Sequence, residues 1–146
     1  MSWDSQLQEL TTGTLHSFRD DLAAEGVPCA AGVYTIWDKE GSFLYVGRSD
    51  NLRKRLNDHA SGRRSGDQFC IYVQDRLVLK TLKSENIEAI SEAEESLDDR
   101  VKECVQAHLH YRFVEIADEI IVKKLEDYIK QSGLHIAVQP LLNPDD

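Results

Sequence analysis

The chain has 146 residues, a formal net charge of −9 at pH 7 and a sequence pI near 5.0. This length suits one well-buried domain and is too short for two comfortable ones, so we expect a single domain over residues 1–146. No apolar run approaches membrane-spanning length, and the three cysteines are widely spaced, which excludes a membrane span and argues against a disulfide framework or a zinc knuckle. With no signal-peptide pattern at the N-terminus, we expect a cytoplasmic protein without membrane association.

The first 28 residues carry apolar side chains at three- and four-residue steps, from Trp3 through Leu10 and again from Leu15 to Leu22. Gly26 and Pro28 end this pattern. The spacing predicts a pair of helical turns or one broken helix.

Two β-branched and aromatic segments follow, over residues 32–38 and 43–47. The polar residues between them include Gly41, which can adopt the positive φ that a hairpin turn needs. The pattern predicts a β-hairpin that places Tyr34 and Tyr45 on neighbouring antiparallel strands.

A short helix is predicted directly after the hairpin. Ser49, Asp50 and Asn51 are candidate N-caps, and the apolar residues Leu52, Leu56 and Ala60 recur at helical spacing. Arg55 and His59 are four residues apart and therefore lie on one face of this helix. A polar, glycine-rich basic loop over 61–67 and a strand over 69–73 are expected next.

The second half of the chain alternates helix and strand. Residues 84–109 predict an acidic helical insertion with an apolar stripe that includes Val101 and Val105. Residues 110–116 predict a half-buried strand, and 118–131 a helix capped by Asp118, with Ile121, Leu125 and Tyr128 facing the core. The prolines of the C-terminal tail favour an extended segment. The fold class is α+β, a small antiparallel or mixed sheet flanked by helices, with a core over 32–143.

One ordered series of residues resembles a known signature. Gly32-Val33-Tyr34, Tyr45-Val46-Gly47, Arg55, His59, Glu126 and Asn143 resemble the motifs of the GIY-YIG nucleases, at the family's usual offsets from Tyr34 to His59. Valines replace the two isoleucines that name the family, and the acidic insertion separates the basic helix from Glu126. Alone, each residue would be an ordinary packing or surface residue, whereas the joint spacing favours a site.

The resemblance implies a GIY-YIG fold and a metal-dependent endonuclease that hydrolyses DNA. Glu126 would hold one Mg²⁺ or Mn²⁺ ion, and Arg55 would clamp the phosphate because its guanidinium can donate two parallel hydrogen bonds. His59 would accept a proton or bind the phosphate. We favour Tyr34 as general base and Tyr45 as phosphate ligand, although the two roles could be reversed. Nucleic-acid contacts are expected from a further set of residues: Arg48, Arg53, Lys54, Arg63, Arg64 and Asn143.

Charge is segregated along the chain. The charged residues of segment 48–64 are mostly basic, whereas those of segment 85–103 are mostly acidic. We expect the basic segment to line the substrate channel and the acidic helix to face away from it. The acidic helix is also a candidate contact for a homodimer or a protein partner.

Two alternatives to a DNA endonuclease remain at this point. One is a catalytically weak module on the same fold that binds nucleic acid or protein. The other is a nuclease acting on RNA or on branched repair intermediates, because the same chemistry serves any phosphodiester.

Overall fold

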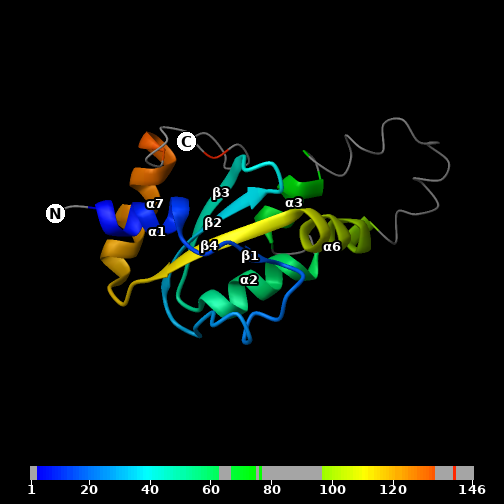
Figure 1. The fold of residues 1–146 in the computed structure, drawn as a ribbon, viewed down its shortest axis with the longest axis horizontal. Helices are drawn as coiled ribbons and strands as arrows, with labels where there is room; N and C mark the ends of the chain where they lie inside the picture. Colours follow the sequence, from blue (N-terminus) through cyan, green and yellow to red (C-terminus); the bar gives the residue numbers. More distant parts are fainter. Residues whose placement is uncertain (1–2, 63–66, 75, 77–96, 134–139, 141–146) are drawn as a thin grey trace.

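The computed structural model describes residues 3–62, 67–74, 76, 97–133 and 140. Helices and strands alternate around one small sheet (Figure 1). In chain order the elements are α1 (Asp4–Thr12), β1 (His16–Ser17), β2 (Gly32–Asp38), β3 (Phe43–Ser49), α2 (Leu52–Ser61), α3 (Gln68–Val73), α6 (Leu97–His108), β4 (Leu109–Glu115) and α7 (Glu119–Ser132).

The sheet has four strands in the order β1-β4-β2-β3, and every pairing is antiparallel. β2 lies between β4 and β3, so both of its edges are hydrogen-bonded, and its first six residues are buried. The β2–β3 hairpin turns at Gly41, whose φ is +89°, and the Asp38 carboxylate accepts hydrogen bonds from the Glu40 and Ser42 amides. The predicted hairpin and the α+β fold are confirmed.

The two faces of the sheet bury separate hydrophobic cores because side chains alternate along each strand. Tyr34 and Ile36 of β2 face one core, which packs beneath α2, α3 and α6. Val33 and Trp37 face the other, which packs beneath α1 and α7. Figure 1 shows α1 and α7 together at one end of the molecule, with α2, α3 and α6 around the other. No helix in the described part of the chain is both long and apolar enough to cross a bilayer.

The strand predicted over 69–73 is wrong, because these residues form the short helix α3. Asp67 begins the helix by accepting a hydrogen bond from the Cys70 amide at 3.1 Å. Phe69, Cys70 and Val73 are fully buried, which fits helical spacing. A five-residue apolar run does not distinguish a strand from a buried helical turn, so the N-cap decided the outcome.

The N-terminal prediction is only partly correct. α1 forms as expected, but residues 16–17 form β1 against β4 instead of a second helical turn. Phe18 and Leu22 are nevertheless buried, as their apolar character requires, whereas Leu15 is 44% exposed.

The described half of the acidic segment, α6, is helical as predicted, and residues 84–96 lie outside the described residues. Val101 and Val105 are buried in the core beneath α2 and α3, so α6 is an integral part of the fold. β4 and the helix capped by Asp118 are also confirmed.

Of the three residues predicted to face the core from α7, Leu125 is buried, whereas Ile121 and Tyr128 are not, and the buried face is shifted one position along the helix. Its buried positions are Val122, Leu125, Glu126 and Ile129, while Tyr128 is 40% exposed. The helix is therefore rotated so that Glu126 faces the sheet, and this rotation matters for the site.

Candidate active site

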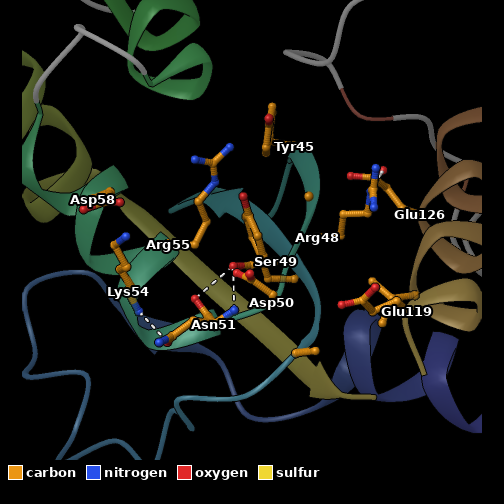
Figure 2. A pocket seen from close by; sticks show the side chains of 14 residues that line it. Tyr45, Arg48, Ser49, Asp50, Asn51, Lys54, Arg55, Asp58, Glu119 and Glu126 are labelled. Carbon is orange, nitrogen blue, oxygen red and sulfur yellow. Dashed lines mark hydrogen bonds and ion pairs between the residues drawn. The ribbon is translucent and has the colours of Figure 1, made fainter. Parts of the chain in front are cut away.

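A cleft with a volume of about 590 Å³ lies between α2 and α7, with β3 forming its floor. Figure 2 shows Arg55 and Lys54 reaching into it from α2, and Glu126 and Glu119 from α7 on the opposite side. Both signature tyrosines also line the cleft. The structure thus brings together, at one surface, motif residues that are up to 92 positions apart in sequence, from Tyr34 to Glu126.

Tyr34 lines the cleft and forms a buried hydrogen-bonded pair with His59, which lies behind it and does not line the cleft. Tyr34 is 1% exposed and His59 is fully buried. The Tyr34 hydroxyl lies 2.6 Å from Nε2 of His59. The pair forms because β2 directs Tyr34 toward the face that α2 covers, and His59 lies in the last turn of that helix.

The other nitrogen of His59, Nδ1, lies 2.8 Å from Oδ2 of Asp67. Burial raises the pKa of Asp67, but the hydrogen bonds from His59 and from the Cys70 amide outweigh it and lower the pKa overall. Asp67 is therefore an ionised acceptor, and a hydrogen bond across this contact requires a proton on Nδ1 of His59. Burial lowers the pKa of His59, which keeps the ring neutral and leaves Nε2 free to accept from the Tyr34 hydroxyl.

Both tyrosines hold their phenolic protons at neutral pH. Burial raises the pKa of Tyr34 well above its ordinary value, and the charge of Arg55 acts in the opposite direction without reversing the shift. Burial likewise raises the pKa of Tyr45 to about 12. A tyrosine acting as a base here must therefore lose its proton at the moment it gains another.

Gly47 makes room for the Tyr34 ring. The two residues lie directly opposite each other in the β2–β3 register. A Cβ atom at position 47 would overlap the hydroxyl and ring carbons of Tyr34. Glycine is thus required at position 47 of the Tyr45-Val46-Gly47 motif because the Tyr34 ring of the first motif packs against it.

The cationic residues predicted to contact nucleic acid divide into three groups. Arg48 and Lys54 line the cleft together with Arg55. Arg53 lies outside it, where its Nε donates to the Val27 carbonyl at 2.8 Å. The remaining predicted contacts, Arg63, Arg64 and Asn143, lie outside the described residues.

Glu126 is a buried carboxylate, 9% exposed, at the edge of the cleft. Its Oε1 accepts from Nε of Arg48 at 3.1 Å and lies 3.9 Å from Nζ of Lys130. Burial raises the pKa of Glu126, and the two cations act against that shift. The carboxylate thus attracts positive charge in a partly desolvated position.

This environment fits a single Mg²⁺ or Mn²⁺ ion held by one carboxylate, with waters and substrate phosphate oxygens completing its coordination. The described residues contain no group of three or more histidine, cysteine or acidic side chains close enough to form a metal cage. A cage is unnecessary for an ion of this kind, because its remaining ligands can come from solvent and substrate.

Asp67 is the site residue that the sequence did not reveal. It follows a glycine-rich loop and precedes an apolar run, so its sequence context indicates only a helix cap. Its eight-residue separation from His59 gives no helical register, because His59 lies in α2 whereas Asp67 caps α3. Only the tertiary contact reveals its second role.

Comparison with known proteins agrees with this geometry. The family model described as the GIY-YIG catalytic domain matches residues 30–103. The matched stretch contains Tyr34, Tyr45, Arg55, His59 and Asp67, and it ends before Glu126.

The chain is also similar to proteins named UvrABC system protein C. It is 34% identical over 71 residues to the one from Legionella pneumophila (strain Lens), covering 49% of this chain and 10% of that protein. It is 35% identical over 65 residues to the one from Tropheryma whipplei (strain Twist), covering 44% and 11%. The chain thus spans about a tenth of the length of the curated relatives it matches.

Proposed function

Because the chain belongs to the GIY-YIG family, we propose that it is a metal-dependent endonuclease that hydrolyses DNA in the cleft between α2 and α7. Membership of the family places the chain among nucleases that cleave phosphodiester bonds. The observation that carries the proposal is the 2.6 Å contact between the hydroxyl of Tyr34 and the buried, neutral His59. Tyr34 lines the same cleft as Arg55 and Glu126.

Tyr34 acts as general base through a proton relay. A water molecule gives a proton to the Tyr34 oxygen while Tyr34 passes its own proton to Nε2 of His59. The hydroxide attacks phosphorus, the P–O bond to the leaving oxygen breaks, and that oxygen takes a proton from solvent. His59 then returns its proton to solvent through Tyr34. The raised pKa of Tyr34 is compatible with this scheme, because no free phenolate accumulates.

Arg55 holds the scissile phosphate and stabilises the charge that develops on its oxygens. It lies on α2 one turn before His59, and it faces the cleft beside both tyrosines. A guanidinium can donate two parallel hydrogen bonds to phosphate oxygens and remains charged at every physiological pH. Tyr45, which is half-buried and lines the cleft, donates its hydroxyl proton to the phosphate.

Glu126 is the residue that would hold the divalent ion. When bound there, such an ion would neutralise charge on the phosphate and on the leaving oxygen. In the structure the Glu126 carboxylate is paired with Arg48 and Lys130, whose side-chain nitrogens lie within 4 Å of it.

DNA is proposed as the substrate because the relay activates a water molecule. A sugar that lacks a 2′-hydroxyl therefore suffices, and RNA has no chemical advantage in this scheme. Branched DNA and RNA, the alternative substrates, are tested in the same assay.

The test is a nicking assay on supercoiled plasmid, with linear, branched and single-stranded DNA and an RNA of matched sequence alongside. We expect cleavage of supercoiled DNA with Mg²⁺ or Mn²⁺, none with excess chelator, and a loss of at least 100-fold in Glu126→Gln. The glutamine keeps the size of the side chain and removes its charge.

The matched control is Asp127→Asn, because Asp127 is the neighbouring acid on α7 and pairs with Lys123 at the surface. It should cleave at the wild-type rate. Undiminished cleavage in chelator would exclude the metal role, and cleavage of the RNA alone would exclude DNA as the substrate.

A further inference from the structure

Asp67 uses its two carboxylate oxygens for two different partners. Oδ1 accepts from the Cys70 amide and caps α3, while Oδ2 accepts from Nδ1 of His59 at 2.8 Å. The Asp67 side chain is 5% exposed and that of His59 is 1% exposed. Water is thus largely excluded from this contact, so the two side chains determine each other's hydrogen bonding.

We propose that Asp67 is a positioning residue that fixes the proton of His59 on Nδ1, so that Nε2 can take the Tyr34 proton during phosphodiester cleavage. This inference rests on the proposed function, and it assigns a role to a residue outside the tyrosine, arginine, histidine and glutamate series. The arrangement Tyr34–His59–Asp67 is a chain of two short buried hydrogen bonds, 2.6 Å and 2.8 Å long.

The need for such a residue follows from the two tautomers of a neutral imidazole. If the proton lay on Nε2, the ring would donate to the Tyr34 oxygen and could not accept its proton. An ionised carboxylate only accepts, so Asp67 permits only the tautomer with the proton on Nδ1. When His59 becomes positively charged during the relay, the same carboxylate stabilises the charge in a buried setting.

The N-cap makes Asp67 well suited to this task. The bond from the Cys70 amide prevents the carboxylate from rotating, and α3 is itself anchored by the buried Phe69 and Val73. His59 is anchored by the C-terminal turn of α2. Both ends of the contact are therefore rigid before any substrate binds.

Two substitutions separate positioning from capping. Asp67→Asn keeps the cap, because its amide oxygen accepts from the Cys70 amide and its NH₂ group must then point at Nδ1 of His59. That geometry moves the His59 proton to Nε2. Asp67→Ser also keeps a cap through its hydroxyl, but it is too short to reach His59 and leaves the tautomer unfixed.

The experiment measures proton position and rate separately. Long-range ¹⁵N–¹H correlation spectra of the full chain without substrate, assigned with His59→Gln, report which nitrogen of His59 carries the proton. We expect Nδ1 in the wild type and Nε2 in Asp67→Asn, with thermal midpoints that stay close. In the plasmid assay, Asp67→Asn should lower kcat by on the order of 10²–10⁴-fold with KM unchanged, and Asp67→Ser should fall between.

Asp118→Asn is the control, since it changes the charge of an exposed helix cap on α7 in the same way. It should match the wild type in spectrum and rate. A wild-type rate in both Asp67 variants, or Nδ1 protonation that persists in Asp67→Asn, would overturn the proposal. If the spectra are as expected but the protein cleaves no nucleic acid, the proposed function is rejected. The effect of Asp67 on the His59 proton would still stand.

Discussion

Tyr34 and Tyr45 have the same side chain on neighbouring strands, yet their surroundings differ. The Tyr34 hydroxyl is paired with a neutral imidazole, which can accept its proton. Tyr45 is less buried and packs its ring against Phe69, with ring centroids 5.1 Å apart. This difference favours Tyr34 as the base and Tyr45 as a phosphate ligand, the assignment that the sequence left open.

Replacing either tyrosine by phenylalanine removes only a hydroxyl. Tyr34→Phe should lower kcat by on the order of 10²–10⁴-fold because the relay is broken. It should also cost about 1–3 kcal/mol of unfolding free energy, since Nε2 of buried His59 loses its partner. Tyr45→Phe should lower kcat less and leave stability nearly unchanged. Single-turnover cleavage and urea titration give both quantities, and equal effects at the two positions would contradict the assignment.

Gly47→Ala tests the packing that seats Tyr34. The added methyl group would overlap the Tyr34 ring, so we expect a cost of about 1–3 kcal/mol in unfolding free energy and a loss of cleavage as the hydroxyl is displaced from His59. Gly41→Ala is the comparison, because its positive φ also makes alanine unfavourable but it lies in the hairpin turn, away from Tyr34. Gly41→Ala should lower the unfolding free energy but leave kcat unchanged under conditions in which the variant stays folded. Normal kcat in Gly47→Ala would show that the ring adapts.

At the scale of elements, the site depends on how two helices cover opposite faces of one sheet edge. α2 packs on the face that carries Tyr34, and α7 on the face that carries Val33 and Val46. Figure 2 shows Arg55 and Glu126 on opposite sides of β3, where both line the cleft. The cleft therefore requires the rotation of α7 that turns Glu126 inward.

The contact between β3 and α7 makes a prediction for metal binding. The guanidinium of Arg48 forms an ion pair with the Glu126 carboxylate, so a metal ion that binds Glu126 must displace it. Arg48→Met should strengthen Mn²⁺ binding by about twofold to fivefold, the size expected for a partly exposed ion pair. Calorimetric titration at pH 8 measures this directly, with Lys124→Met as an exposed control on α7 and Glu126→Gln as the non-binding reference. Weaker binding in Arg48→Met would mean that Arg48 supports the metal site.

At the scale of the whole molecule, the charge distribution is more mixed than the sequence pattern suggested. The cleft is lined by three cations and four acids: Arg48, Lys54, Arg55, Asp50, Asp58, Glu119 and Glu126. α6, the described half of the acidic segment, contributes no residue to this lining. The acidic residues of α6 thus lie away from the cleft. The acidic residues that do line it come from α2, α7 and the loop before α2.

This balance predicts weak, shallowly salt-dependent binding to generic DNA. Two or three phosphates neutralised in the cleft give a slope of about −2 to −3 in log K against log salt concentration. Fluorescence anisotropy with a duplex across a salt series measures the slope, and Arg55→Met should reduce its magnitude by about one. A much steeper slope would mean that cations outside the described cleft, such as Arg63 and Arg64, contact DNA, which Arg63→Glu with Arg64→Glu would test.

Stability should depend on pH through His59. Its pKa is lowered in the folded state by burial, whereas the unfolded chain titrates near 6.5. Below about pH 6.5 the unfolded chain binds a proton that the folded state refuses, so unfolding free energy falls as pH falls. The groups that face His59 are Asp67, Tyr34, Arg55, Asp58 and Tyr45.

Urea unfolding between pH 7.5 and 5 measures this dependence. The wild type should lose stability toward pH 5, and His59→Gln should lose less because it has no imidazole to protonate. Parallel curves for the two proteins would show that His59 titrates alike in both states.

The sequence by itself determined the elements whose signals are local. β-branched and aromatic residues predicted β2 and β3, alternation predicted β4, and a cap followed by helical periodicity predicted α2 and α7, because these patterns depend only on neighbouring residues. The ordered tyrosines, Arg55 and His59 carried the resemblance to the GIY-YIG family. A hairpin followed at once by a helix brings these four residues close together.

Only the tertiary structure decided the features that depend on contacts between elements. α3 replaced a predicted strand because Asp67 caps it and the core beneath α6 accepts a helix. The need for Gly47 came from strand register, and the inward turn of Glu126 from the packing of α7 on the sheet. Asp67 contacts His59 because the start of α3 packs beside the end of α2, and residue spacing does not encode that contact. The sequence therefore showed which reactive side chains the protein carries, whereas the contact partner of each side chain was set by packing in three dimensions.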